Sequence, residues 1–237
     1  MKIILDVENT TTKRDGKLHL DPFEPDNSLT LVGVLDWLEY DSEIFVFDHK
    51  EKRITDDDSK ERLQRVLDNT TLLIGHNLQY DLQWLWACGF EYQGQIFDTM
   101  LGEYILQRGQ KQSVSLENCA LRYDLDMKKS DTLKDYFKRG FQTDEIPLDE
   151  LSEYLHQDLV VTKSLYWKLM EEYEEAGGFA AETAALVVGF DDSDEDLKKL
   201  IDQRKSAYEK IEAVLPEHAM SYAAVGARIP RMIEFWS

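Results

Sequence analysis

The chain begins with an apolar run that carries two acids, Ile3-Ile4-Leu5-Asp6-Val7-Glu8. Its aliphatic and β-branched residues predict a buried β-strand. Because alternate side chains of a strand share a face, Asp6 and Glu8 should point the same way. Two neighbouring carboxylates repel each other unless water or a positive charge lies between them. The ordinary interpretation is a solvated strand end, and the alternative is a site whose partners come from elsewhere in the chain.

Composition narrows the class of protein. Of the 237 residues, 43% are hydrophobic, which is enough for a core. The sequence has no apolar run of membrane-spanning length and no signal-peptide pattern. We therefore expect a cytoplasmic protein with no membrane partner, in the host-cell cytoplasm if the chain is viral. Cys88 and Cys119 lack the spacing of a zinc or redox motif and are expected to be buried, reduced thiols.

The net charge argues against an ordinary duplex-binding protein. Acidic residues number 47 and basic residues 27, which gives a formal net charge of -20. Such a surface does not attract nucleic acid over long distances. Short-range binding of a nucleic-acid end, through metal ions and a few local cations, remains compatible with it.

Apolar patterns predict strands first and helices later. Residues 10–27 are polar and contain Gly16, Pro22 and Pro25, which predicts a long turn or excursion. Four further strands are expected at Ser28–Leu38, Ile44–Phe47, Leu72–Ile74 and Gln95–Phe97. Helical spacing begins near Asp58 and recurs at Leu78–Trp86, Thr99–Gln107, Ser115–Tyr123, Leu133–Phe137 and Leu148–Glu175. This order predicts an α/β protein with a mixed five-stranded sheet flanked by helices.

Gly177-Gly178 marks a predicted domain boundary. Residues 1–176 would form the α/β domain, and residues 177–237 a C-terminal helical extension. Within that extension, residues 179–215 show helical spacing, and the segment after them has no clear period.

Two later segments carry acids that could join the first pair. Gly75-His76-Asn77-Leu78-Gln79-Tyr80-Asp81 has an asparagine and an aspartate four residues apart, on one face of a helix start. Helix capping and the helix dipole explain this pair as well as a site does. In Tyr154-Leu155-His156-Gln157-Asp158 the tyrosine and the aspartate share the face directed toward the core. Burying a carboxylate alone costs several kcal/mol, so this aspartate needs a partner.

Together, Asp6, Glu8, Asp81 and Asp158 would offer four oxygen donors from one strand and two helices. Hard cations such as Mg²⁺ or Mn²⁺ prefer oxygen ligands, and two ions roughly 3.5–4 Å apart can clamp a phosphodiester. Tyr154, one helical turn before the last acid, could orient the attacking water.

His76 and His156 are rivals for the role of general base. Neither has a carboxylate partner at helical spacing that would orient it. Packing or surface roles therefore explain both better than catalysis does.

Three motifs now stand in a recognisable order: Asp6-Val7-Glu8, Asn77-Leu78-Gln79-Tyr80-Asp81 and Tyr154-Leu155-His156-Gln157-Asp158. Over about residues 1–175 the chain resembles the DEDD superfamily of 3′-to-5′ exonucleases. The Tyr-x-x-x-Asp form of the third motif is similar to the DEDDy branch. The resemblance implies a ribonuclease H-like fold.

A finer resemblance comes from Gly75-His76-Asn77 and Phe97-Asp98-Thr99. Both are similar to the proofreading domain of family A DNA polymerases of the bacteriophage type. Residues 179–215 faintly resemble the start of the polymerase region that follows such domains.

The resemblance implies roles for the motif residues. Asp6, Glu8, Asp81 and Asp158 would hold two Mg²⁺ or Mn²⁺ ions, and Tyr154 would position the nucleophilic water. These five residues form the implied catalytic set.

Other residues would contact the substrate. Asn77 would lie beside the terminal nucleotide, with Asp98 as a supporting acid near the site. The family often has Thr directly after the Glu of the first motif, whereas here Asn9 precedes Thr10. A contact between Thr10 and the 3′-hydroxyl is therefore an open expectation.

The resulting prediction is a metal-dependent exonuclease that shortens single-stranded or frayed DNA 3′ ends and releases nucleoside 5′-monophosphates. One alternative is an exoribonuclease of the ribonuclease D type. Another is an accessory or binding module of a split polymerase, whose segment from Phe179 docks a separate polymerase chain. Basic residues between the second and third motifs are either strand contacts or parts of solvated helix faces: Arg108, Lys111, Lys128, Lys129, Lys134, Lys138 and Arg139.

Overall fold

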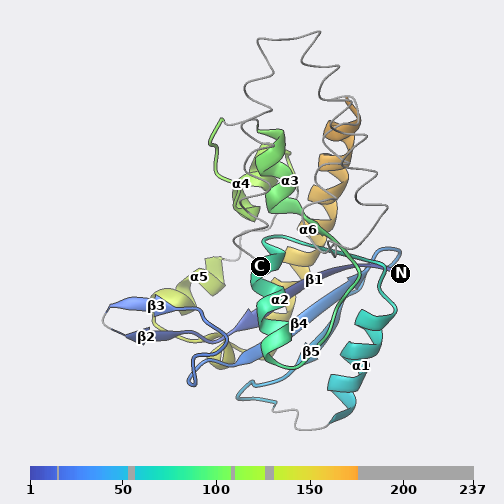
Figure 1. The fold of residues 1–237 in the computed structure, drawn as a ribbon. Coiled ribbons are helices and arrows are strands. Elements are labelled where there is room, and N and C mark those ends of the chain that lie inside the picture. Colours follow the sequence, from blue (N-terminus) through green and yellow to red (C-terminus); the bar gives the residue numbers. More distant parts are fainter. Residues whose placement is uncertain (15, 53–56, 108–109, 126–130, 176–237) are drawn as a thin grey trace. The chain divides into compact units, whose positions relative to one another are not determined.

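The computed structural model describes residues 1–14, 16–52, 57–107, 110–125 and 131–175 (Figure 1). The expected helical extension over residues 177–237 and its boundary at Gly177 lie outside the described residues.

Five strands form the main sheet, in the order β5-β4-β1-β6-β7. Strand β4 pairs antiparallel with both β1 and β5, whereas β6 and β7 run parallel to β1. This arrangement confirms the predicted mixed sheet and the ribonuclease H-like α/β fold. The strands are β1 (Lys2–Asn9), β4 (Leu29–Asp36), β5 (Glu43–Val46), β6 (Leu72–Gly75) and β7 (Gln95–Asp98).

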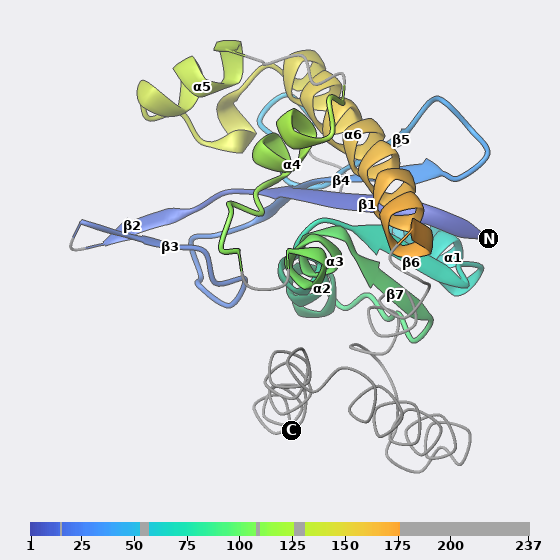
Figure 2. The same ribbon diagram turned by 90° about the horizontal axis from the view of Figure 1, so that it is seen from above.

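Helices cover both faces of the sheet (Figure 2). On one face Ile3, Leu5 and Val7 pack into a core shared with α1 and α2. On the other face Ile4 packs into a second core, to which α4 and α6 contribute. The helices are α1 (Asp57–Asp68), α2 (Leu78–Ala87), α3 (Thr99–Leu106), α4 (Leu116–Arg122), α5 (Asp131–Lys138) and α6 (Leu148–Glu175), with a 3-10 turn at Thr143–Glu145.

The long helix α6 approaches the sheet closely at Gly33. A Cβ at this position would lie 2.8 Å from Leu155 Cγ and 2.8 Å from Leu159 Cδ1. Gly33 is also the direct partner of Asp6 in the β1–β4 ladder. The absence of a side chain therefore lets α6 pack against the sheet beside Asp6.

Strand β1 extends beyond its parallel neighbour. Its pairing with β6 covers Lys2 to Ile4, whereas its pairing with β4 continues to Asn9. On the side facing β6, the backbone after Ile4 needs other hydrogen-bond partners.

The long turn or excursion predicted over residues 10–27 contains strands that the sequence pattern did not predict. Two short strands, β2 (Thr12–Arg14) and β3 (Lys17–His19), form an antiparallel hairpin there. Gly16 has φ +75°, which allows the tight reversal between them. Strands of three residues are too short to produce a periodic apolar signal.

The cysteines and the apolar character of the helices were also the subject of predictions. Cys119 is buried and Cys88 is half-buried, and both are free thiols. None of the described helices is long and apolar enough to cross a membrane.

Candidate active site

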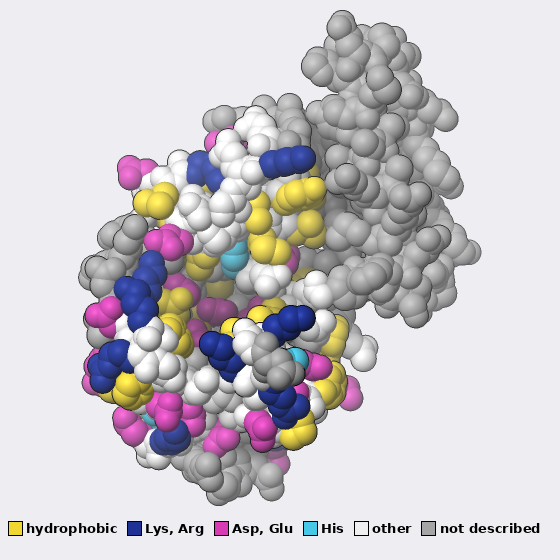
Figure 3. All heavy atoms as spheres, turned by 90° about the vertical axis from the view of Figure 1, so that its left-hand side faces the viewer, with side chains coloured by type: hydrophobic (Ala, Val, Ile, Leu, Met, Phe, Trp, Pro, Cys, Tyr) yellow, Lys and Arg dark blue, Asp and Glu magenta, His cyan; other side chains and the backbone are white. Residues whose placement is uncertain are grey.

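The acids of the three motifs gather where β1, β6 and β7 end. Because these strands are parallel, their carboxyl ends share one edge of the sheet, where open α/β sheets commonly place their sites. Figure 3 views this side of the molecule and shows a hollow with acidic side chains inside and Lys or Arg groups around its rim.

Asp81 ties α2 to the unpaired end of β1. The backbone N–H of Val7 donates to Oδ1 of Asp81 at 3.0 Å and to Oδ1 of Asp6 at 3.0 Å. The carboxyl groups of Asp81 and Asp6 also interact with each other. The strand end that β6 leaves open is therefore closed by a carboxylate from α2.

Asp158 and Tyr154 bring α6 to the same place. Asp158 is 8% exposed and carries a hydrogen bond from Tyr154, one helical turn earlier. The charge of Asp158 acts on both Asp6 and Glu8. The structure thus brings together the predicted carboxylates from β1, α2 and α6.

Burial raises the pKa of each of these four carboxyl groups. Burial, followed by the charge of Asp158, raises the pKa of Asp6 to about 7. Burial raises the pKa of Asp158 to about 6 and holds the pKa values of Glu8 and Asp81 well above their ordinary range. Asp6 and Glu8 keep partial solvent exposure, but protein atoms and like charges surround their carboxylates. Among the described residues, negative charge is therefore in excess at this site.

This donor set has the chemistry of a hard-cation site. Four carboxylates supply oxygen ligands, which Mg²⁺ and Mn²⁺ prefer. As the side chains stand, no three His, Cys, Asp or Glu residues in the described part of the chain are gathered as ligands of one metal ion. Binding an ion would therefore require the carboxylates to move closer together.

Asn77 is held in an unusual conformation at the start of α2. It has φ 65° and ψ 43°, in the left-handed region, and its side chain makes no capping hydrogen bond. Capping comes from Asp98 instead, whose carboxylate accepts from the backbone N–H groups of Asn77 and Leu78 at 3.0 Å each. The same carboxylate caps α3 by accepting from Met100 and Leu101. Asp98 thus fixes two helix starts, and the exposed side chain of Asn77 takes no part in capping α2.

The two histidines have packing partners. His76 contacts the hydroxyl of Thr99 and the carbonyl of Val114, each at 2.9 Å, and His156 contacts the hydroxyl of Ser42 at 3.0 Å. Burial lowers the pKa of His76. These contacts agree with the packing or surface interpretation, which stays a prediction.

Thr10 and Asn9 are engaged in the structure of the loop. The hydroxyl of Thr10 accepts from the backbone N–H of Ser28 at 2.7 Å, and the amide of Asn9 donates to the Thr10 carbonyl at 2.8 Å. Tyr80 of α2 donates to the Asn9 oxygen at 2.8 Å. The expected contact of Thr10 with a 3′-hydroxyl stays a prediction.

Most of the described cationic candidates already have partners. Lys134 pairs with Glu117, Lys138 with Asp135, and Arg139 lies over the ring of Phe141. Lys111 has a positive φ of 57°. Arg108, Lys128 and Lys129 lie outside the described residues.

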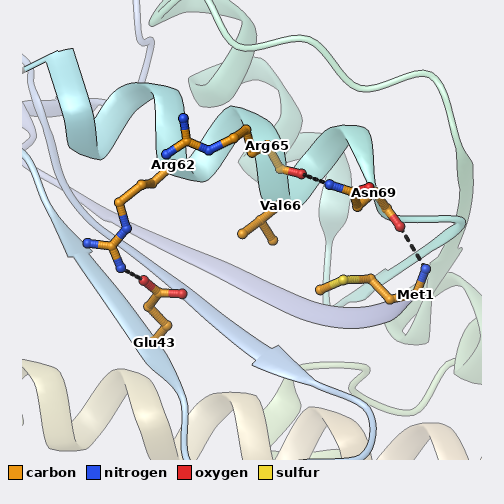
Figure 4. Close-up of a pocket in the computed structure, with 6 residues that line it drawn as sticks. All are labelled: Met1, Glu43, Arg62, Arg65, Val66 and Asn69. Carbon is orange, nitrogen blue, oxygen red and sulfur yellow. Dashed lines mark hydrogen bonds and ion pairs between the residues drawn. The ribbon is translucent and has the colours of Figure 1, made fainter.

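A separate pocket lies between α1 and β5, near the start of β1 (Figure 4). Arg62 and Arg65 line it, and Arg62 pairs with Glu43 across it. The pocket is at the opposite end of β1 from Asp6 and Glu8, and none of the predicted site residues lines it.

Residues 27–174, more than half of the chain, match a family described as 3′-5′ exonuclease. The chain belongs to this 3′-5′ exonuclease family. It is therefore a phosphodiester hydrolase of the DEDD superfamily, as the coarser part of the resemblance implied. The match begins after β1, so Asp6 and Glu8 lie outside it. The narrower bacteriophage-polymerase type stays a prediction.

Solved structures share the fold of this exonuclease. NrnC of Brucella melitensis with bound Mg²⁺ is 19% identical, with a TM-score of 0.52 and coverage of 78% of each chain. The same protein bound to pGG is 18% identical, with the same TM-score and coverage. RNase D of Trypanosoma brucei is 16% identical, with a TM-score of 0.52 and coverage of 82% of this chain and 69% of that one.

Gly33 is the site residue that sequence reasoning missed. It lies in an apolar strand pattern, where a glycine weakens the strand and gives no chemical signal. A glycine inside a strand can mark a close approach of another element, and this is the signal that could have identified it.

Proposed function

We propose that this chain removes nucleotides one at a time from the 3′ end of a single strand and releases nucleoside 5′-monophosphates. Asp6, Glu8, Asp81 and Asp158 would hold the divalent cations that the reaction uses. The observation that carries the proposal is the convergence of these carboxylates, from one strand and two helices, with pKa values raised above the ordinary range. A cluster of this kind is stable at neutral pH when cations neutralise it.

Bound Mg²⁺ or Mn²⁺ would supply Lewis-acid stabilisation of a phosphodiester and a lowered pKa for water. The Mg²⁺ in the structure of Brucella NrnC, which has the same fold, supports this choice of ion. The chain's own contribution is to hold the four carboxylates at the open end of the sheet.

Tyr154 would orient the attacking water without removing its proton. Burial and the negative charge of Asp158 raise the pKa of its phenol above the ordinary value. The hydroxyl therefore stays protonated at neutral pH, where it can donate to Asp158 and accept from a water.

Asn77 would contact the terminal nucleotide, because its exposed side chain is unused by the helix that it begins. A non-glycine residue in the left-handed region is strained, and Asp98 maintains that conformation. Thr10 remains a second proposed contact, for the 3′-hydroxyl.

The structural comparisons favour RNA over DNA as the substrate. The similar folds include an RNase D and NrnC bound to pGG. DNA is the second candidate, supported by the motif resemblance to proofreading domains, including Phe97-Asp98-Thr99. Digestion of matched RNA and DNA strands, each labelled at its 5′ end, decides between them.

The test of the catalytic assignment is 3′-end shortening of labelled strands in Mg²⁺ by Asp6→Asn and Glu8→Gln variants. We expect the ladder of products to disappear in both variants. Asp36→Asn, at the far end of β4, is the matched control and should retain activity. Equal rates for all four proteins would refute the assignment.

A further inference from the structure

The β2–β3 hairpin carries several basic residues beside the active-site edge. Lys13, Arg14 and Lys17 are exposed, and the hairpin sequence contains one acid, Asp15. Three positive charges against one negative charge leave this hairpin at plus two, in a chain whose formal charge is -20.

The base of the hairpin is firmly built. The hydroxyl of Thr12 donates to Asn27 at 2.7 Å, and the Asn27 amide donates to the His19 carbonyl at 3.1 Å. The backbone N–H of Thr11 donates to Gln142 at 3.0 Å. Because both strands are tied to the domain at their base, the exposed cations are carried on a fixed arm.

The pairing of the two strands places like charges opposite each other. Arg14 is the direct partner of Lys17, an arrangement that destabilises an antiparallel pair. Arg14 is compensated by Glu24 at 2.5 Å and Asp26 at 3.3 Å. Within the described residues, neither Lys17 nor Lys13 makes an ion pair. The hairpin therefore keeps two cations available for an anionic ligand.

The arm continues directly from the strand that carries the first two acids. Lys13 is five residues beyond Glu8, a distance of at most about 17 Å in extended chain. Figures 1 and 2 show β2 and β3 projecting past the sheet beyond the end of β1. Phe23, in the loop after β3, is 76% exposed. Exposed cations together with exposed aromatic rings are the usual means of holding a single strand.

We propose that the β2–β3 arm binds the sugar–phosphate backbone of the substrate strand, a few nucleotides before the 3′ end that is cleaved. The inference rests on the proposed function, because it extends the path of the same strand. The lysines of the arm would attract the phosphates of the strand locally, although the net charge of the chain repels them. Long strands, which reach the arm, would therefore bind better than short ones.

The experiment compares the full chain with a Lys13→Gln, Lys17→Gln double variant on two substrates, a dinucleotide and a single strand of about 15 nucleotides. We expect KM for the long strand to rise about ten-fold and dinucleotide turnover to stay unchanged. The slope of log KM against log salt should fall by about 1.4, because each phosphate contact to a single strand contributes about 0.7.

A Lys2→Gln, Lys60→Gln variant, with both changes on exposed side chains away from the hairpin, is the matched charge control. Equal KM values and salt slopes for the two double variants would overturn the proposal. Binding of the long strand is also measured by fluorescence anisotropy in an Asp158→Asn background. If no protein cleaves any strand, the proposed function fails, while weaker binding confined to the arm variant would still support the arm.

Discussion

The two halves of one face of β1 differ in almost every property. Ile4 and Asp6 both point toward α6, yet Ile4 is fully buried in an apolar core and Asp6 lies among other acids. The difference begins where β6 ends its pairing with β1, at Ile4. Side-chain direction is therefore the same in both halves, and the neighbouring elements decide whether the face becomes core or site.

The halves also contribute oppositely to stability. Burying a side chain such as Ile4 contributes roughly 1.5–3 kcal/mol. Ionising Asp158, whose pKa rises from 3.8 to about 6, costs the metal-free fold about 3 kcal/mol. The apolar half of β1 thus stabilises the fold, whereas the acidic half destabilises it until cations neutralise the carboxylates.

The largest expected effect separates these halves directly. Asp158→Asn should lower kcat at least about 1,000-fold, because about 4 kcal/mol of transition-state stabilisation is lost with one metal ligand. Its thermal stability without metal should stay equal or rise, since a crowded carboxylate is removed. Ile4→Val should do the opposite, losing about 1 kcal/mol of stability and keeping its activity. Steady-state kinetics and thermal melts on both variants check this.

The next largest effect is expected when helix α6 is displaced from strand β4 at Gly33. Gly33→Val would place methyl groups where Leu155 and Leu159 now lie and displace α6 from Asp6. We expect about a 100-fold loss of kcat, with about 2 kcal/mol of lost stability from overpacking. Val32→Ala, on the opposite face of the same strand, is the control. It should lose similar stability and keep its rate, and a similar loss of rate would argue against the close-approach account.

Tyr154→Phe should reduce kcat by about 10–100-fold. The hydroxyl orients a water and does not take its proton, so the shape of the pH–rate profile should be unchanged. Disappearance of a limb of that profile would show instead that Tyr154 is the general base.

The smallest expected effect is on substrate contact. Asp98→Ala removes the cap of two helix starts, at about 1 kcal/mol each, and releases Asn77 from its strained conformation. KM should rise about ten-fold while kcat changes less. Asp98→Asn keeps one acceptor oxygen and should recover part of the loss, which a purely electrostatic role for Asp98 would not allow.

Much of this site could be predicted because spacing and motif order are written in the sequence. Alternation fixed the shared direction of Asp6 and Glu8, and the four-residue step fixed that of Tyr154 and Asp158. Alternation alone did not show that the face of the acids is also core, at Ile4. Where β6 would stop was not visible, because strand ends depend on pairing partners far along the chain.

Other features could not be predicted for different reasons. The β2–β3 hairpin is held by contacts such as Thr12 to Asn27 and not by an apolar period. The double cap by Asp98 links residues about 20 positions apart, which no local pattern reports. Asn77 holds the predicted N-cap position, but the capping oxygen comes from another strand end.

The most direct test of a metal-binding carboxylate cluster is thermal stability against pH, with and without Mg²⁺. Because the folded protein holds protons that the unfolded chain releases above pH about 4, metal-free stability should fall as pH rises through about 6 and about 7, the pKa values of Asp158 and Asp6. Saturating Mg²⁺ should raise Tm by about 5 °C or more at pH 8 and little at pH 5. Asp158→Asn should lose most of that rise. A rise independent of pH, or equal in wild type and variant, would contradict the account.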